Sequence, residues 1–282
     1  MNVLGISGNV NTGAQDSAAV IMKNGKLLFA QEEERFTRLK HSVSSLPLQS
    51  IKKGLQYCNL TIFDIDVVAY FAEYYNFRDR LKSFFLHHFN YCPRIVFKNH
   101  HLCHAASAFY SSGFKQSCIL TSDFSGDGIS TGLYYSKNNK IIVHKLFKKP
   151  QSLGIFYSII TQILGFRRDS DEYKVMGMSS YGKPTFDLSW LIKKTSSGYS
   201  LNENYLNKLN LTGTKLPSKQ EPLYNKKILK KINFNPSTIE VYNKNHYDFA
   251  ASAQKILNEI SVSLCKKLKK RFNLQNLCIA GG

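Results

Sequence analysis

The sequence predicts an α/β fold built from two similar halves, and two observations support this. Each half opens with three short apolar strands in a row, a pattern that predicts an antiparallel meander. A glycine-containing loop follows the first strand of each half, at residues 8–14 and 124–128. The repetition indicates an internal duplication in which the two loops face each other across a cleft. The six strands are expected at residues 3–7, 17–22, 26–30, 118–122, 129–135 and 140–147.

The other elements of the first half follow from turn signals and apolar spacing. Asn24-Gly25 between two strands is a strong signal for a two-residue hairpin. The mixed-charge run at residues 31–41 is too charged for a core and is expected to be a solvent-exposed connection. After Pro47 we expect a helix at 48–57, a strand at 67–71, an aromatic helical stretch at 76–89 and a strand at 94–97.

In the second half, a helix is expected from Ser152 through Ile163. A long helix at residues 247–272 then leads into a strand at 277–280. Residues 185–245 are polar and rich in lysine, which suggests an inserted or variable region. A strand that closes on Ala-Gly-Gly normally continues into a turn and a helix, so the chain is expected to be cut short.

This strand order is that of the actin-like fold of sugar kinases and heat-shock ATPases, in which two such hairpin loops hold the phosphates of a nucleotide. We therefore expect a duplicated, actin-like α/β fold whose second half is incomplete. The expected subdomains are residues 1–115 and 116–282, and the second includes the lysine-rich region. A pattern match of this kind supports a fold and says little about a reaction.

Composition narrows the class of protein. With 43% hydrophobic and 20% charged residues, the chain is ordinary for a globular protein, and no apolar run is long enough to span a membrane. The N-terminus shows no secretory signal, and six cysteines without a CxxC pair fit buried thiols in a reducing cytoplasm. The formal net charge is +19, but the excess is lysine on polar or helix-surface stretches. Nucleic acid is therefore not expected as the main partner.

Residues 99–110 look like a partly buried helix whose first turns contain three histidines. Positions i and i+4 of a helix share a face, so His100 and His104 can aim their rings at one point. Asp123 follows on the next strand and offers a carboxylate as a third ligand. Two imidazoles and a carboxylate that leave coordination positions of the metal open suit catalytic iron or zinc. The alternative is that the histidines only cap the helix or satisfy polar groups in the core.

Two further segments carry groups that suit binding. Beside Asp123, the turn Gly126-Asp127-Gly128 lets the backbone approach a ligand closely. Farther along, Glu172 and Lys174 are two residues apart, a spacing that would place both on the same side of an extended segment. A surface ion pair is the alternative there.

Several longer blocks run in one order over almost the whole chain outside the lysine-rich region. They are Gly5-Ile6-Ser7 with Asp16-Ser17-Ala18-Ala19, EERFTR with Lys40-His41, HHLCHAASAFY, TSDFSGDGIST, SLGIFYS, LGF with EYKVMGMSSYG, and the final NLCIAGG. In these blocks the sequence resembles the N-terminal domain of the O-carbamoyltransferases that modify nodulation factors and antibiotics. That family is related to the enzymes that make threonylcarbamoyl-adenosine on tRNA.

The resemblance implies a two-part enzyme. A C-terminal domain would make carbamoyl adenylate from carbamoyl phosphate and ATP, and the actin-like part would transfer the carbamoyl group to a hydroxyl of a small molecule. By match, His100, His104 and Asp123 would hold iron or a similar divalent ion. The carbamoyl and nucleotide pocket would be lined by the blocks that contain Ser17, Lys40, Gly126, Asp127, Gly128, Glu172, Lys174 and Gly177, and Gly281 and Gly282 would begin the adenosine-binding turn.

Carbamoyl transfer needs the carbonyl group to be polarised and the charge of the adenylate phosphate to be neutralised. A Lewis-acid metal together with Lys40 or Lys174 could do both. Transfer also gains from a general base. Many relatives have histidine before the Asp-Ser-Ala-Ala block, but this chain has Gln15, which cannot act as a base near neutral pH. Either Asp16 or His101 would then act as the base, or transfer is impaired. The chain also stops before the family's later metal-ligating aspartate and before its adenylate-forming domain.

Two alternatives to a carbamoyltransferase remain open. One is an inactive nucleotide-binding fragment, which Gln15 and the early end of the chain favour. The other is a relative in the tRNA-modifying branch, which the lysine excess favours.

Overall fold

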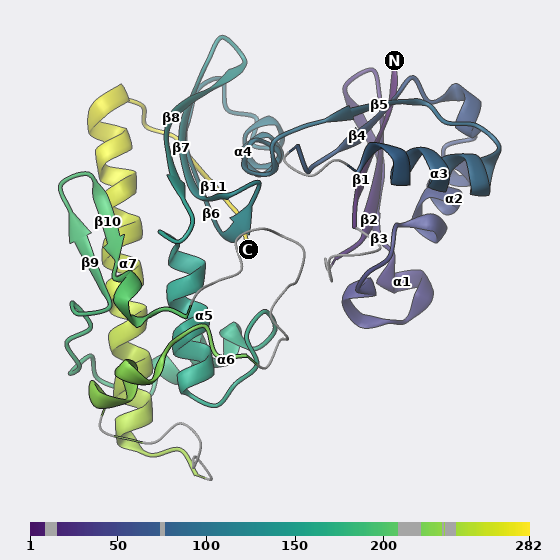
Figure 1. Cartoon of the computed structure of the whole chain (residues 1–282). Coiled ribbons are helices and arrows are strands. Elements are labelled where there is room, and N and C mark those ends of the chain that lie inside the picture. Colours follow the sequence, from purple (N-terminus) through teal and green to yellow (C-terminus); the bar gives the residue numbers. More distant parts are fainter. Residues whose placement is uncertain (9–15, 74–76, 208–220, 233, 235–240) are drawn as a thin grey trace. The chain divides into compact units, whose positions relative to one another are not determined.

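The structure is a computed structural model, and it describes residues 1–8, 16–73, 77–207, 221–232, 234 and 241–282 (Figure 1). The residues group into two compact units, each with most of its contacts within itself. The boundary lies between Cys103 and His104, inside a helix, and the units are called unit 1 and unit 2. The predicted glycine loop at 8–14 lies outside the described residues except for Gly8, and Gln15 lies outside them too.

Unit 1 contains a five-stranded sheet with the strand order β3-β2-β1-β4-β5. Its strands are β1 (Asn2–Ser7), β2 (Ala18–Lys23), β3 (Lys26–Glu32), β4 (Val67–Tyr70) and β5 (Arg94–Phe97). The first three are antiparallel neighbours, whereas β4 and β5 continue the sheet in parallel from β1. Asn24 and Gly25 have φ values of 50° and 79°, as the predicted hairpin turn requires. The first predicted meander is confirmed.

Helices cover this sheet and complete the core of unit 1. They are α1 (Glu34–Thr37), α2 (Leu48–Tyr57) and α3 (Arg78–Phe89), with short 3₁₀ turns at Lys40–Ser42 and Ile62–Asp64. Helix α2 lies close to the sheet because Gly54 has no side chain: a Cβ atom there would stand 2.7 Å from the Phe29 ring. Leu4, Ile21 and Ile51 are fully buried between the layers.

The charged run at residues 31–41 is only partly the exposed connection that was expected. Glu33 is 3% exposed. Its carboxylate accepts hydrogen bonds from the backbone N–H groups of Gln49 and Ser50 at 2.9 and 2.7 Å, and from the Ser50 hydroxyl at 2.8 Å. A negative charge at the first turn of α2 satisfies helix N–H groups that have no partner within the helix. Glu33 is therefore a buried cap of α2.

Unit 2 repeats the meander in a four-stranded sheet with the strand order β11-β6-β7-β8. The strands are β6 (Cys118–Gly126), β7 (Ile129–Lys137), β8 (Lys140–Lys148) and β11 (Leu277–Ala280). Strands β6, β7 and β8 are antiparallel, and β11 joins β6 in parallel. The same order of meander and parallel strand in both units is the predicted duplicated, actin-like fold.

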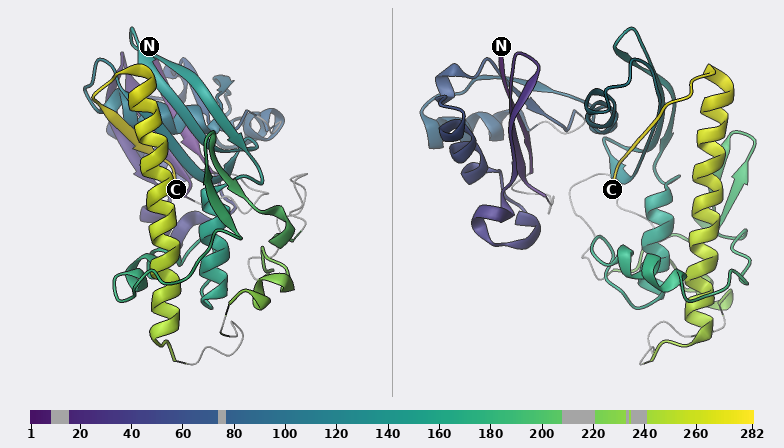
Figure 2. Two further views of the ribbon diagram at one scale, coloured as in Figure 1. Left: turned by 90° about the vertical axis from the view of Figure 1, so that its left-hand side faces the viewer. Right: turned by 180° about the vertical axis from the view of Figure 1, so that it is seen from behind.

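Helices pack on both faces of the second sheet (Figures 1 and 2). Helix α4 (His100–Ser111) contains the boundary between the units, and its Ala105 and Phe109 pack with Ile119 of β6 in unit 2. The neighbouring residues Cys118 and Leu120 instead join the cluster formed by α5 (Leu153–Ile163) and α7 (Lys244–Phe272). Successive side chains of a strand point to opposite faces, so α4 lies on one face and α5 and α7 lie on the other.

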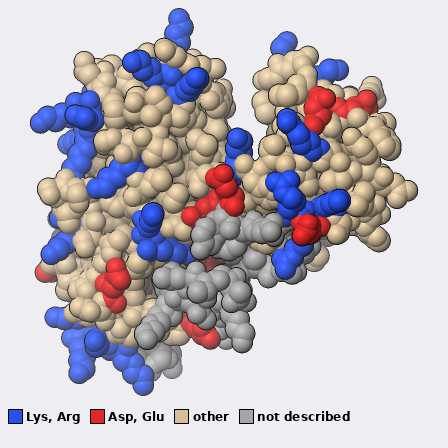
Figure 3. Space-filling model, turned by 45° about the horizontal axis from the view of Figure 1, so that its top comes forward, with Lys and Arg blue, Asp and Glu red and all other residues tan. Residues whose placement is uncertain are grey.

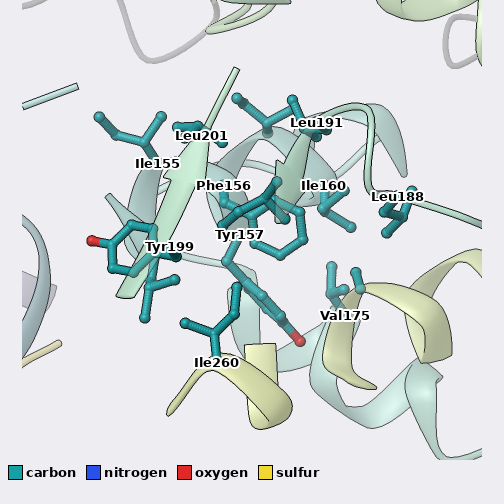
Figure 4. Close-up of a cluster of buried hydrophobic side chains, with 14 of the residues drawn as sticks. Ile155, Phe156, Tyr157, Ile160, Val175, Leu188, Leu191, Tyr199, Leu201 and Ile260 are labelled. Atoms are coloured by element: carbon teal, nitrogen blue, oxygen red, sulfur yellow. The ribbon is translucent and has the colours of Figure 1, made fainter. Parts of the chain in front are cut away.

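Part of the lysine-rich region belongs to the main core of unit 2. The strands β9 (Ile192–Thr195) and β10 (Gly198–Leu201) form a hairpin there, and short 3₁₀ turns occur at Glu203–Tyr205 and Lys226–Lys230. Leu188, Leu191 and Tyr199 pack with Phe156 and Ile260, side chains labelled in Figure 4. Because its apolar residues are scattered among polar ones, the region shows no periodic pattern, although those residues are buried. The segments 208–220 and 235–240 lie outside the described residues.

Candidate metal and transfer site

Helix α4 begins where the histidines begin. The Asn99 side-chain oxygen accepts a hydrogen bond from the backbone N–H of Leu102 at 3.2 Å, as a helix cap does. Ala105 and Phe109 turn one face of α4 into the core, and His100 and His104 are both half-buried. The spacing that predicted a shared face therefore rests on an observed helix.

Asp123 is held at an irregular point of β6. The pairing of β6 with β7 shifts register between Ser122 and Gly126, and a bulge of this kind can redirect a side chain. The Asp123 Oδ1 atom accepts a hydrogen bond from the backbone N–H of Phe124 at 2.6 Å, while Oδ2 lies 3.3 Å from Nε2 of His104. The carboxylate thus faces helix α4.

The amino end of α5 supports Asp123 from behind. Ser152 caps α5, and its hydroxyl lies 3.1 Å from the carbonyl oxygen of Asp123 and 2.9 Å from that of Phe124. Gly154 allows this approach, since a Cβ atom on it would stand 2.6 Å from the Phe124 backbone. The SLGIFYS block therefore positions the end of β6.

His100, His104 and Asp123 place ligand-type atoms within 4.8 Å of one another, and all three side chains are half-buried. Two imidazole nitrogens and one carboxylate oxygen form a donor set that suits iron or zinc, with positions left for other ligands. This donor set fits the metal that the resemblance implied. The roles of these residues as metal ligands stay a prediction.

His101 differs from its two neighbours, because its side chain is fully buried. Its ring lies edge-on to the ring of His100, with 5.5 Å between the ring centroids. Burial of this kind favours a packing role, and the predicted catalytic role of His101 is untested.

A second cluster of functional side chains lies in unit 1. The ring nitrogen Nδ1 of His41 lies 2.9 Å from Oδ1 of Asp16, and the Asp16 N–H donates to the His41 carbonyl at 2.8 Å. The backbone N–H of His41 also donates to Oε2 of Glu34 at 2.7 Å. That hydrogen bond holds the pKa of Glu34 below its ordinary value, with smaller contributions from nearby basic groups. Asp16, Glu34 and His41 together offer ligand-type atoms within 4.8 Å.

Two other predicted residues lie close to this cluster along the chain. Lys40 is exposed and precedes His41 in the 3₁₀ turn. Ser17 is 1% exposed, and its backbone carbonyl accepts a hydrogen bond from the N–H of Glu33 at 2.8 Å. The predicted roles of Ser17 and Lys40 in substrate binding are untested.

The Gly126-Asp127-Gly128 turn joins β6 to β7, and Asp127 and Gly128 both have positive φ values, 51° and 75°. The backbone N–H of Lys149 donates to the Gly128 carbonyl at 3.1 Å. The Lys149 ammonium lies 5.5 Å from the centroid of the Phe124 ring. Burial lowers the pKa of Lys149, and the nearby Asp123 carboxylate opposes that shift. Lys149 was not found from the sequence, where it is one lysine among many.

The segment with Glu172 and Lys174 is helical, so the prediction of an extended segment is wrong. These residues belong to α6 (Glu172–Ser179), in which a spacing of two does not place side chains on one side. The Glu172 carboxylate accepts hydrogen bonds from the N–H groups of Asp169 and Ser170 and from the Ser158 hydroxyl. Asp169 and Ser170 belong to the turn before α6 and Ser158 belongs to α5, and the sequence pattern did not reveal these contacts.

Lys174 forms an ion pair with Asp171 at 2.9 Å, so it has a partner other than Glu172, with which the alternative above paired it. Hydrogen bonding between the two lowers the pKa of Asp171 and raises that of Lys174. Gly177 is open to solvent, and Gly281 packs so closely on the Ser122 carbonyl that a side chain there would overlap it. Gly282 follows with open space around it. Nucleotide binding by any of these residues is untested.

Comparison with known proteins identifies the family. The family model described as the N-terminus of carbamoyltransferases matches residues 75–282, so the chain belongs to the carbamoyltransferase family. The chain is 30% identical to the uncharacterized protein sll1178 of Synechocystis. The match includes 100% of this chain and 50% of that protein. The chain is also 30% identical to the nodulation protein NolNO of Sinorhizobium fredii, over 96% of this chain and 41% of that protein. The chain spans half or less of these relatives, and the predicted resemblance is confirmed.

Solved structures give more distant similarities. One is an activator of 2-hydroxyisocaproyl-CoA dehydratase from Clostridium difficile, at 15% identity and a TM-score of 0.44, with 100% of this chain and 80% of that chain covered. Another is a Ppx/GppA family member from Aquifex aeolicus, at 13% identity and a TM-score of 0.37. This match covers 100% of this chain and 94% of that chain. Within the described part of the chain, no helix is long and apolar enough to cross a membrane.

Proposed function

We propose that this chain is the transfer part of an O-carbamoyltransferase. In the proposed step, a hydroxyl oxygen of a small-molecule acceptor bonds to the carbamoyl carbon of carbamoyl adenylate. The bond from that carbon to the phosphate oxygen breaks, AMP leaves, and the hydroxyl proton passes to a base. Carbamoyl phosphate and ATP would be the source of the adenylate. Family membership supports this proposal, and the observation that carries it is the grouping of His100, His104 and Asp123.

His100, His104 and Asp123 would hold a divalent metal, with iron as the first ion to test, because two imidazoles and a carboxylate suit it. When bound, the ion would supply a Lewis acid that polarises a carbonyl or phosphoryl oxygen. The chain's own part is positioning. Helix α4 fixes both rings, and the contacts of Ser152 and Gly154 hold the end of β6 that carries Asp123.

The pair of Asp16 and His41 is our candidate for the base. With its Nδ1 atom 2.9 Å from the carboxylate of Asp16, the ring of His41 can keep its Nε2 atom for the hydroxyl proton. A carboxylate that orients an imidazole in this way stabilises the imidazolium that forms during proton transfer. Asp16 would thus act through His41, which supplies the base that Gln15 cannot.

The proposal is tested by following labelled carbamoyl groups. The chain would be mixed with ATP, ¹⁴C-labelled carbamoyl phosphate and an adenylate-forming domain supplied as a separate polypeptide, together with a panel of hydroxyl-bearing sugars. We expect label on an acceptor only when the chain and a divalent metal are both present, and much less label with His104→Ala. Nucleotide binding without any transfer would contradict the proposal and favour the inactive fragment.

The tRNA-modifying branch is a second candidate, supported by the excess of lysine and arginine over acidic residues. Figure 3 shows the basic side chains scattered in several groups on this face. Retention of radiolabelled tRNA at about 0.15 M salt would favour this branch, because phosphate contacts weaken steeply as salt rises. Loss of retention at that salt would count against it.

The cysteines, all six without a disulfide, support a cytoplasmic location for either enzyme.

A further inference from the structure

Unit 2 contains a surface pocket of about 510 Å³ that the proposed reaction does not explain. It lies between the end of β8 with the residues that follow it and the β9–β10 hairpin. Its walls come from residues 145–151 on one side and from residues between Thr195 and Glu203 on the other. Both sides belong to one unit and consist of described residues.

The floor of the pocket is aromatic and well fixed. Phe147 and Tyr199 stack with 4.7 Å between ring centroids, and they are 7% and 4% exposed. Gly198 makes this possible, because its φ is 144° and a Cβ atom there would stand 2.4 Å from the Phe147 ring. The Tyr199 hydroxyl is 2.9 Å from the Thr131 hydroxyl and donates to the Gln151 carbonyl at 3.1 Å. The floor therefore does not depend on a ligand for its shape.

The rim of the pocket is positively charged. Lys145, Lys148 and Lys149 line it, and Glu203 is the one acidic residue among the described residues that line it. The carboxylate of Glu203 already accepts a hydrogen bond from the Gln151 side chain at 3.1 Å. The Lys149 ammonium is directed toward Phe124 and Asp123, which leaves Lys145 and Lys148 as the cations available to the pocket. Two lysines beside one engaged carboxylate favour an anion there.

The lysines differ in what else they do. Lys145 donates to the Ser197 carbonyl at 2.6 Å and lies 4.9 Å from the centroid of the Phe147 ring, so its head is held over the floor. An ammonium group has three donors, and the carbonyl takes one of them. Lys148 is exposed and forms no ion pair with any described residue. The hairpin is also fastened by Lys267, which donates to the carbonyls of Thr195 and Ser196, both at 2.9 Å.

Hydroxyl groups complete the lining. Thr195, Ser197 and Ser200 reach the pocket from the hairpin side. Hydroxyls and exposed backbone can bind the uncharged hydroxyl groups of a ligand, whereas lysine heads bind a phosphate as point charges. We propose that this pocket binds a phosphorylated small molecule with sugar-like hydroxyls, with its phosphate on Lys145 and Lys148. This proposal does not depend on the carbamoyl-transfer function.

Calorimetric titration of the whole chain with glucose 6-phosphate, inorganic phosphate and glucose tests the proposal at about 0.15 M salt, where weak surface contacts are screened. We expect glucose 6-phosphate to bind most tightly, inorganic phosphate more weakly, and glucose not to bind. Lys148→Gln should weaken glucose 6-phosphate binding about tenfold, because a charge-assisted hydrogen bond is lost. Lys145→Gln should weaken it at least as much.

Lys140→Gln is the matched control, since Lys140 opens the same strand and is not among the lining residues. It should bind like the wild type. Lys145→Gln could also move the hairpin, so the exposed Lys148 provides the deciding variant. Equal affinities for the Lys140 and Lys148 variants would overturn the proposal, as would no binding of glucose 6-phosphate up to about 10 mM.

Discussion

At the scale of single residues, the pair of Asp16 and His41 combines mutual contacts with a left-handed backbone at both positions. Their φ values are 60° and 64°, in the left-handed region that side chains with a Cβ atom rarely adopt. Such conformations persist where the surroundings over-determine them, and they cluster at functional sites. The mutual hydrogen bonds of Asp16 and His41 and the contact to Glu34 provide those surroundings.

If His41 takes the acceptor proton, His41→Gln should lower the transfer rate about 100-fold, the usual effect of losing a general base. Glutamine can still hydrogen-bond to Asp16 but cannot accept a proton near neutral pH. The rate would be measured with the labelled carbamoyl assay, with His87→Gln on α3 as the exposed control. Equal rates for the two variants would remove His41 from the reaction.

The sequence could predict that His100 and His104 lie close together, but it could not predict the contact between Asp16 and His41. His100 and His104 are four residues apart on a helix, so their proximity follows from local geometry. Asp16 and His41 are separated by two strands and a short helix, and their contact depends on where the chain returns after α1. Glu33 was misjudged for a related reason, because its partners Gln49 and Ser50 lie on another helix.

At the scale of secondary-structure elements, the site depends on how closely α5 meets β6. Gly154 lets the first turn of the helix touch the backbone of Phe124, and Ser152 bonds to the Asp123 carbonyl. Helix packing at this distance leaves no room for a methyl group. The strand end that carries Asp123 should therefore move when the helix is pushed away.

Gly154→Ala should lower the free energy of unfolding by about 1–3 kcal/mol, the usual cost of overpacking. It should also weaken metal binding, although Gly154 is not a proposed ligand. Urea denaturation and a metal titration would measure the two effects. Gly177→Ala in α6 is the control, because open space surrounds Gly177 and alanine favours helices by up to about 1 kcal/mol. Unchanged metal affinity in Gly154→Ala would show that α5 does not position Asp123.

At the scale of the whole molecule, the duplication was predictable because each meander has its own alternation and turn signals. The packing of residues 188–201 into the core was not predictable, since Leu188, Leu191 and Leu201 are spread among polar neighbours. Those apolar residues are fixed by contacts with α5 and α7, which are far away along the chain. Sequence periodicity reports local structure and cannot show such contacts.

Charge also acts on the stability of unit 2 as a whole. Asp248 of α7 is 3% exposed, and its carboxylate accepts a hydrogen bond from the Lys183 N–H at 2.7 Å and pairs with Lys244. These contacts, the Lys183 N–H first, lower the pKa of Asp248 below its ordinary 3.8. A carboxyl group with a lowered folded-state pKa stabilises the fold above its unfolded pKa and loses this effect as the pH falls through its folded pKa.

Asp248→Asn should therefore unfold at a lower temperature than the wild type at pH 7. The difference should be constant down to about pH 5 and should shrink below 3.8 as the wild-type carboxylate is protonated. Thermal unfolding followed by circular dichroism at several pH values would measure it. Glu259→Gln, which removes an exposed carboxylate from the same helix, serves as the control. A pH-independent difference for Asp248→Asn would mean that the charge of Asp248 is not what stabilises the fold.

The most direct test of the account is the metal content of the purified chain after reloading with ferrous iron and desalting. The wild type should retain about one ion per chain, and His104→Ala should lose most of it, because one of three proposed ligands is gone. His87→Ala, which removes an exposed histidine from α3, should retain as much as the wild type. Equal metal content in the wild type and in His104→Ala, with both folded, would contradict the proposed metal site.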